Sequence, residues 1–162
     1  MSYLNTPNFD LWFEMKKEFE GFRIKAYKDS GGVWTIGFGS TYNHDKNRKV
    51  QESDVITKEA AINWMKVDAN EVVRQLNIYV KIKLKDTQTT AICDYIYNRG
   101  IGNFLRTQLD ELINSNSEID KICREIEGTG LKDRLGNILN GLIRRRKSES
   151  YLYRNGVLKF YF

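Results

Sequence analysis

Two carboxylic acids and a hydroxyl lie close together near the start of the chain: Glu20, Asp29 and Thr35. Cleavage of a glycosidic bond needs an acid that protonates the leaving oxygen. It also needs a second group that stabilises positive charge on the sugar or directs water to it. Two carboxyl groups in different environments meet both needs. Glu20 and Asp29 are therefore candidates for such a pair.

The first element that must position them is a helix. Apolar residues at helical spacing predict a helix over residues 9–20, with Glu20 in its last turn. Gly21 stands where a left-handed residue would end that helix. The negative end of the helix dipole disfavours an ionised carboxylate at Glu20, which suits a general acid.

The second element is a hairpin. Residues 22–28 and 33–38 have the patterns of strands, and the turn cluster Asp29-Ser30-Gly31-Gly32 separates them. Thr35 then lies on the strand opposite the arm that leads to Asp29. A hydroxyl there can hold a water between itself and the aspartate, as an inverting mechanism requires.

The rest of the chain is predicted to be helical, after a polar stretch over 42–50 that is expected to add one short exposed strand. Thr57 is the expected N-cap of the first long helix, and Ser117 resembles the start of a capping box. The expected helices cover residues 58–76, 86–98, 105–113, 119–126 and 141–153. The predicted fold is α+β and mostly helical, a single domain over 1–162. We expect an αβ head (9–56) and a helical body (57–162), with a ligand cleft between them.

Composition narrows the class of protein. The 162 residues are 41% hydrophobic and 29% charged, an ordinary globular balance, with a formal net charge of +5. Residues 1–56 hold eight basic and eight acidic side chains, so the positive excess lies in 57–162 and predicts attraction to a polyanion: nucleic acid, an anionic membrane or the bacterial wall. Cys93 and Cys123 lack metal-site spacing and are expected to be buried free thiols. No apolar run reaches the ~20 residues of a membrane helix, and no standard signal peptide is seen.

A longer match surrounds the carboxylates. The stretch from Glu20 to Gly39 resembles, without gaps, the signature of phage-type lysozymes, glycoside hydrolase family 24: E-G-x-R, then A-Y-x-D, then G-x-x-T-x-G-x-G. The segments 95–100 and 141–149 resemble that family more loosely, in the right order. The resemblance implies that Glu20, Asp29 and Thr35 are the catalytic residues. Ser40 departs from it, because many members have a histidine there.

The resemblance also implies the function. Members have a lysozyme-like fold and hydrolyse the β-1,4 bond between N-acetylmuramic acid and N-acetylglucosamine in peptidoglycan, and many are endolysins that lyse the host cell. We accordingly expect anomeric inversion, no cofactor, no metal, and a monomer that binds peptidoglycan. We expect neither nucleic-acid binding nor stable membrane insertion, and residence in the host cytoplasm until release to the wall.

Weaker expectations concern substrate contacts and alternative functions. Gly31 and Gly32 are interpreted equally well as turn residues or as a close approach for the saccharide. Tyr42 is a candidate for stacking on a sugar, Asn98 for a contact at a helix end, and Arg145 for a contact near substrate, although an arginine of 144–146 is expected to point inward to an acidic partner. A non-catalytic peptidoglycan-binding relative, a lytic transglycosylase and a chitinase remain alternatives.

Overall fold

The computed structural model describes residues 2–162, which divide into two compact units. Unit 1 comprises the chain up to Trp12 together with Glu71–Phe162, and unit 2 comprises Phe13–Asn70. The boundaries fall inside two helices, so each of these helices contributes residues to both units. All three candidate catalytic residues belong to unit 2.

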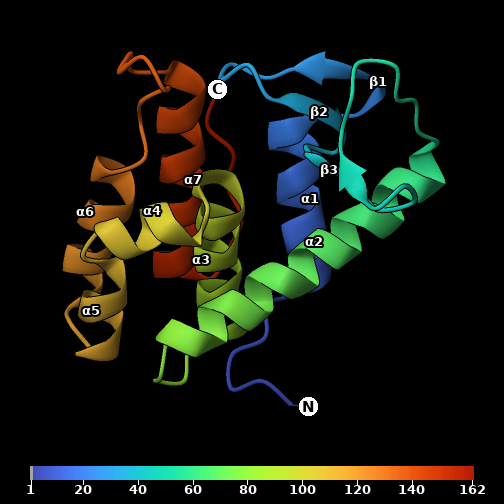
Figure 1. Ribbon diagram of the computed structural model, residues 1–162. Helices are drawn as coiled ribbons and strands as arrows, with labels where there is room; N and C mark the ends of the chain where they lie inside the picture. Colours follow the sequence, from blue (N-terminus) through green and yellow to red (C-terminus); the bar gives the residue numbers. More distant parts are fainter. Residues whose placement is uncertain (1) are drawn as a thin grey trace. The chain divides into compact units, whose positions relative to one another are not determined.

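The described residues form the mostly helical α+β fold that the sequence predicts (Figure 1). The helices are α1 (Phe9–Glu20), α2 (Lys58–Tyr79), α3 (Asp86–Arg99), α4 (Ile101–Arg106), α5 (Leu109–Asn114), α6 (Ile119–Gly128) and α7 (Asn140–Asn155). The strands are β1 (Arg23–Lys28), β2 (Trp34–Gly37), β3 (Tyr42–Asn43) and β4 (Arg48–Lys49).

The predicted hairpin is present in unit 2, as β1 paired antiparallel with β2. Tyr27 stands directly opposite Thr35 in this ladder, and the register shifts between Arg23 and Tyr27. In the shifted stretch β1 bonds instead to the segment before α2, through a bridge between Lys25 and Val55. The hairpin is therefore tied along its outer strand to the rest of unit 2.

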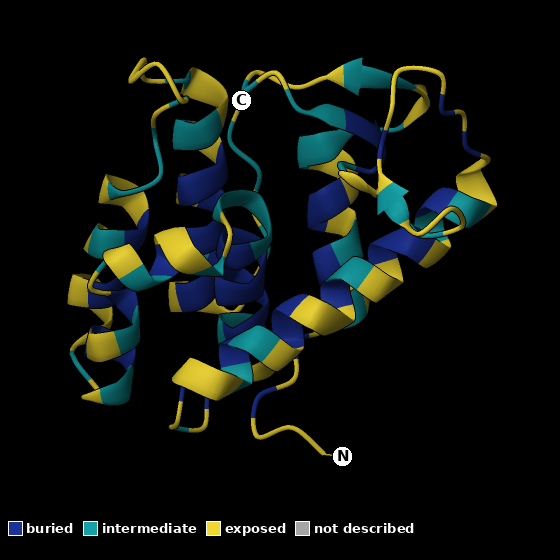
Figure 2. Ribbon diagram, in the orientation of Figure 1, coloured by how far each residue is buried: buried dark blue, intermediate teal, exposed yellow. Residues whose placement is uncertain are grey.

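An apolar cluster lies under the hairpin. It joins residues of β2, the following loops and the first turns of α2, and its buried members are Ile36, Phe38, Val50, Ile56, Ala61, Trp64 and Met65. The ring of Phe22, just after α1, packs 5.2 Å from that of Phe38. Figure 2 shows that α2 has one buried face, which joins this cluster in its first turns, and one exposed face. This core fixes β2 and, with it, Thr35.

The polar stretch 42–50 differs from its prediction. It forms two short strands, β3 and β4, that pair with each other rather than one strand added to the hairpin. Asn47 takes a left-handed conformation (φ 51°) in the turn between them, which asparagine tolerates better than most residues. The Asn43 side chain accepts a bond from the backbone N–H of Lys46 at 2.9 Å, which closes the same turn.

Unit 1 is built around α3, which packs against α7 (Figure 1). Every residue from Thr89 to Ile96 is buried, as expected of a helix with neighbours on all sides. Helix α6 packs against α7 and contributes Ile122, Cys123 and Ile126 to the interior. Both cysteines are buried, and neither forms a disulfide, as predicted.

Two of the helix predictions were wrong in detail. The helix expected over 105–113 is divided into α4 and α5, because Thr107 is extended (φ −81°, ψ 179°). Its hydroxyl donates to the carbonyl of Phe104 at 2.6 Å and accepts the N–H of Leu109 at 3.1 Å. A side chain that bonds its own backbone in this way competes with helix continuation. Ser117 does not cap α6; its hydroxyl pairs with that of Ser115.

Candidate active site

Glu20 is the last residue of α1, as the sequence predicts. Gly21 follows in the left-handed conformation (φ 64°), and its N–H donates to the carbonyl of Lys17 at 3.1 Å, which ends the helix. The Glu20 side chain lies against the backbone of Gly39: a Cβ placed there would come within 2.9 Å of Oε2 and 3.0 Å of Cδ. Gly39 also has a φ of 86°, so both its conformation and the room it leaves for Glu20 require glycine.

Asp29 is held by the hairpin turn. Its Oδ1 accepts the N–H groups of Gly31 at 2.8 Å and Val33 at 2.9 Å, while its own N–H donates to the carbonyl of Val33 at 3.0 Å. These bonds fix the direction of the carboxylate and occupy Oδ1. The other oxygen, Oδ2, is the one through which Asp29 can act on another molecule.

The two turn glycines have distinct parts in this arrangement. Gly31 supplies one of the N–H donors that hold Asp29. Gly32 has a φ of 75°, and a Cβ there would meet nothing within 4 Å. The turn conformation, rather than crowding, accounts for glycine at this position.

Thr35 is only 4% exposed, on β2. Its hydroxyl donates to the carbonyl of Val33 at 3.0 Å. Because its hydrogen is committed to that bond, Oγ1 acts toward any further partner as an acceptor. Thr35 and Asp29 are thereby both anchored by the same residue, Val33.

Ser40, which stands where many family members have a histidine, bonds to an acidic residue of α2, Asp68. The Ser40 hydroxyl donates to Oδ2 of Asp68 at 2.7 Å, and Nε2 of His44 lies 2.8 Å from Oδ1. The ring of His44 packs edge-on against Trp64 at 5.6 Å. His44 is thus half-buried. An imidazole four positions later accompanies the serine that replaces the family's usual histidine.

The remaining predicted substrate contacts lie in different parts of the chain. Tyr42 is exposed in unit 2, and its hydroxyl bonds Oδ1 of Asn47 at 2.6 Å. Asn98 and Arg145 belong to unit 1. Oδ1 of Asn98 accepts from Arg146 at 2.7 Å, and Arg145 bonds both carboxylate oxygens of Asp94, at 2.9 and 3.1 Å. The two arginines therefore point inward, as the sequence analysis expected of one of them.

Asp94 belongs to a buried ionic network that the sequence did not reveal. Burial alone would raise the pKa of Asp94, but the adjacent Arg145 guanidinium brings it below the usual range. The indole N–H of Trp12 also donates to Asp94, at 3.1 Å. Burial raises the pKa of Glu149 well above its usual range and lowers that of Arg146, which lies 3.0 Å from it. A charged residue inside the apolar run 91–96 was the only signal of this network.

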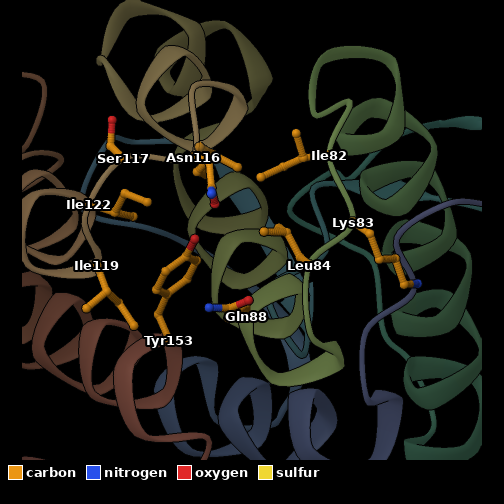
Figure 3. Close-up of a pocket in the computed structure, with 10 residues that line it drawn as sticks. Ile82, Lys83, Leu84, Gln88, Asn116, Ser117, Ile119, Ile122 and Tyr153 are labelled. Carbon is orange, nitrogen blue, oxygen red and sulfur yellow. The ribbon is translucent and has the colours of Figure 1, made fainter.

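A pocket lies wholly within unit 1. It has a volume of about 160 Å³ and, as Figure 3 shows, combines apolar side chains such as Leu84 and Ile122 with the polar groups of Gln88, Asn116 and Tyr153. Burial raises the pKa of Tyr153 to about 12, so its phenol stays neutral. None of the candidate catalytic residues lines this pocket, so it is not where the predicted chemistry takes place.

Within residues 2–162, no group of three or more His, Cys, Asp or Glu side chains is arranged to hold a metal ion. None of the helices in that range is long and apolar enough to cross a membrane.

Comparison with known proteins places this chain in a family. The phage lysozyme family model matches residues 17–149. The endolysin of Acyrthosiphon pisum secondary endosymbiont phage 1 is 32% identical over 138 residues, which cover 85% of this chain and 90% of that protein. The endolysin of Salmonella phage P22 is 38% identical over 90 residues, 56% of this chain and 60% of that one.

Solved structures agree. The endolysin from Escherichia coli O157:H7 phage FAHEc1 superimposes with a TM-score of 0.81 at 25% identity, over 91% of this chain and 93% of that one. A mutant of P22 lysozyme gives a TM-score of 0.73 at 26% identity, over 92% of this chain and 97% of that one. The range matched by the family model contains Glu20, Asp29 and Thr35 together with the hairpin that holds them. The chain belongs to the phage lysozyme family.

Proposed function

We propose that this protein is an endolysin-type lysozyme that hydrolyses the β-1,4 bond between N-acetylmuramic acid and N-acetylglucosamine. Membership of the phage lysozyme family supports a glycosidase that lyses peptidoglycan. The observation that carries the finer proposal is the placement of Glu20, Asp29 and Thr35. All three lie in unit 2, each fixed by backbone contacts of its own.

In the proposed reaction Glu20 is the general acid. It donates its proton to the glycosidic oxygen as the bond from that oxygen to the anomeric carbon breaks. A water held by Asp29 and Thr35 attacks the same carbon from the opposite face, and Asp29 accepts the proton that this water loses. The products are two sugar chains, one with a new reducing end, and the anomeric configuration is inverted.

The division of roles follows from the contacts. Glu20 is the last residue of α1, and its side chain lies against the backbone of Gly39. Asp29 accepts two backbone N–H groups on one oxygen, which orients the carboxylate and leaves its other oxygen to act on a water. Two carboxyl groups in such different settings are what acid and base roles require.

The proposal is tested with Glu20→Gln and Asp29→Asn, which keep shape and remove the acid or base. Release of reducing ends from purified peptidoglycan should fall by about 10²–10⁴-fold in each variant, the usual contribution of general acid–base catalysis. Wild type and Glu20→Gln with equal rates would refute the proposal. Sedimentation with peptidoglycan without release of reducing ends, in wild type itself, would indicate the non-catalytic wall-binding alternative.

Partners and location are part of the same proposal. We expect the substrate to be peptidoglycan, the protein to act as a monomer, and the positive excess of residues 57–162 to favour the anionic wall over other surfaces. Among the predicted sugar contacts, Gly32 and Tyr42 are exposed. Some relatives, such as that of Enterobacteria phage P21, are described as SAR-endolysins. For this chain we propose residence in the host cytoplasm before release to the wall.

A further inference from the structure

A water held by Asp29 and Thr35 would still lack a hydrogen-bond donor to its oxygen. The Thr35 hydroxyl gives its hydrogen to the carbonyl of Val33, so toward a water it acts as an acceptor. Ionised Asp29 is also an acceptor only. A water held by these two gives them both of its hydrogens. One lone pair of its oxygen then faces the anomeric carbon, and the other is open to a hydrogen-bond donor.

Tyr27 is the residue placed to be that donor. It stands directly opposite Thr35 in the antiparallel ladder, so the two side chains lie on the same face of the hairpin, with Cβ atoms about 5 Å apart. Asp29 begins the turn one residue after the end of β1, two residues beyond Tyr27. The hairpin therefore places Tyr27 and Thr35 on one face, next to the turn that holds Asp29.

The surroundings of Tyr27 keep its phenol protonated. Burial raises the pKa of Tyr27 above its usual value, and Glu20 and Asp29, when ionised, raise it further, against an opposing effect of Arg23. The phenol is thus within electrostatic reach of both carboxylates. The guanidinium of Arg23 lies 5.3 Å from the centre of the ring, which restrains the ring's orientation.

We propose that Tyr27 is a fourth catalytic residue, whose phenol hydroxyl donates a hydrogen bond to the attacking water held by Asp29 and Thr35. This inference rests on the proposed hydrolysis. The donor fixes the water so that its free lone pair points at the anomeric carbon, and the proton that the water loses still goes to Asp29. No bond to Tyr27 itself forms or breaks in the reaction.

The test is Tyr27→Phe, which keeps the ring and its contact with Arg23 and removes only the donor. We expect kcat to fall about tenfold, the effect of one hydrogen bond, with KM for soluble peptidoglycan fragments and the thermal midpoint unchanged. Tyr79→Phe, a matched loss of one phenol on an exposed residue of α2, should leave kcat unchanged. An unchanged kcat in Tyr27→Phe would overturn the inference, as would a rise in KM that accounts for the whole loss.

A double-mutant cycle separates a shared water from an independent effect. Thr35→Val removes one acceptor of the same water, so adding Tyr27→Phe in that background should lower kcat by less than about twofold. Fully additive losses would contradict a shared water. Glu20→Gln, assayed in parallel, keeps the two proposals distinguishable. If Glu20→Gln is inactive while Tyr27→Phe retains full activity, only the proposed role of Tyr27 is wrong. If Glu20→Gln is fully active, the proposed hydrolysis itself is wrong.

Discussion

Replacement of Gly39 by alanine tests the placement of the catalytic acid without altering the acid itself. The added methyl group would lie 2.9 Å from Oε2, 3.0 Å from Cδ and 3.1 Å from Cγ of Glu20. Carbon and oxygen atoms in contact prefer separations of about 3.5 Å, so the carboxyl group must retreat by about 0.5 Å. Misplacement of a reacting group by about 1 Å can cost a factor of about 10² in rate. We therefore expect kcat in Gly39→Ala to fall by about tenfold or more.

A matched control removes the effect of backbone strain. Gly136, in the loop before α7, has a φ of 87°, almost the same as the 86° of Gly39, and a Cβ there would meet nothing within 4 Å. Alanine in this left-handed region costs about 1–2 kcal/mol at either position. Both variants should therefore lose about 2–8 °C in thermal midpoint, but only Gly39→Ala should lose activity.

The assay is release of reducing ends from purified peptidoglycan, measured well below both thermal midpoints. A circular dichroism spectrum of each variant confirms that it is folded. If Gly39→Ala and Gly136→Ala have equal kcat values while both are folded, the contact between residue 39 and Glu20 does not control the acid, and the reasoning is refuted.

Three further predictions concern acidic residues that accept bonds from neighbouring side chains: Asp54, Asp94 and Asp68. Asp54→Asn should lower the free energy of unfolding by about 1.5–3 kcal/mol at pH 7. Because bonds from Arg48 hold the pKa of Asp54 well below its usual range, wild type keeps this stabilisation above about pH 4 and loses it as the pH falls further. In urea unfolding, the difference in stability between wild type and Asp54→Asn should therefore be smaller at pH 3 than at pH 7. Asp94→Asn leaves the Arg145 guanidinium buried without its anion and should cost about 3–5 kcal/mol in thermal or urea unfolding; a cost below about 1 kcal/mol would contradict the structure. Asp68→Asn should lower the free energy of unfolding by about 1–3 kcal/mol. His44→Ala should destabilise the wild-type protein, but it should cause little further loss in the Asp68→Asn variant.

The sequence predicted the parts of the site whose geometry is local. The end of α1 at Glu20 follows from helical spacing and a glycine, and the hairpin from two strand patterns around a turn. Asp29 and Thr35 are anchored by bonds within a few residues, to Gly31 and Val33. Their positions are therefore encoded in the segment that also carries the family signature.

Contacts between distant residues were not predictable in this way. Asp94 and Arg145 are separated by 51 positions, and periodicity predicts only that both stretches are helical. Asp68 bonds to Ser40 and His44, which precede it by 28 and 24 residues in the chain. The break between α4 and α5 depends on a single side chain, Thr107, that bonds its own backbone. Each of these needs the folded chain to bring its partners together.

The fate of water during the reaction tests the central claim most directly. Peptidoglycan is digested in water enriched in a heavy oxygen isotope, and the released muropeptides are analysed by mass spectrometry. If Glu20 protonates the leaving oxygen while Asp29 and Thr35 direct a water to the anomeric carbon, every new N-acetylmuramic acid end is reducing and carries one heavy oxygen. Products that end in anhydromuramic acid without heavy oxygen would contradict the account, because no water would then have attacked.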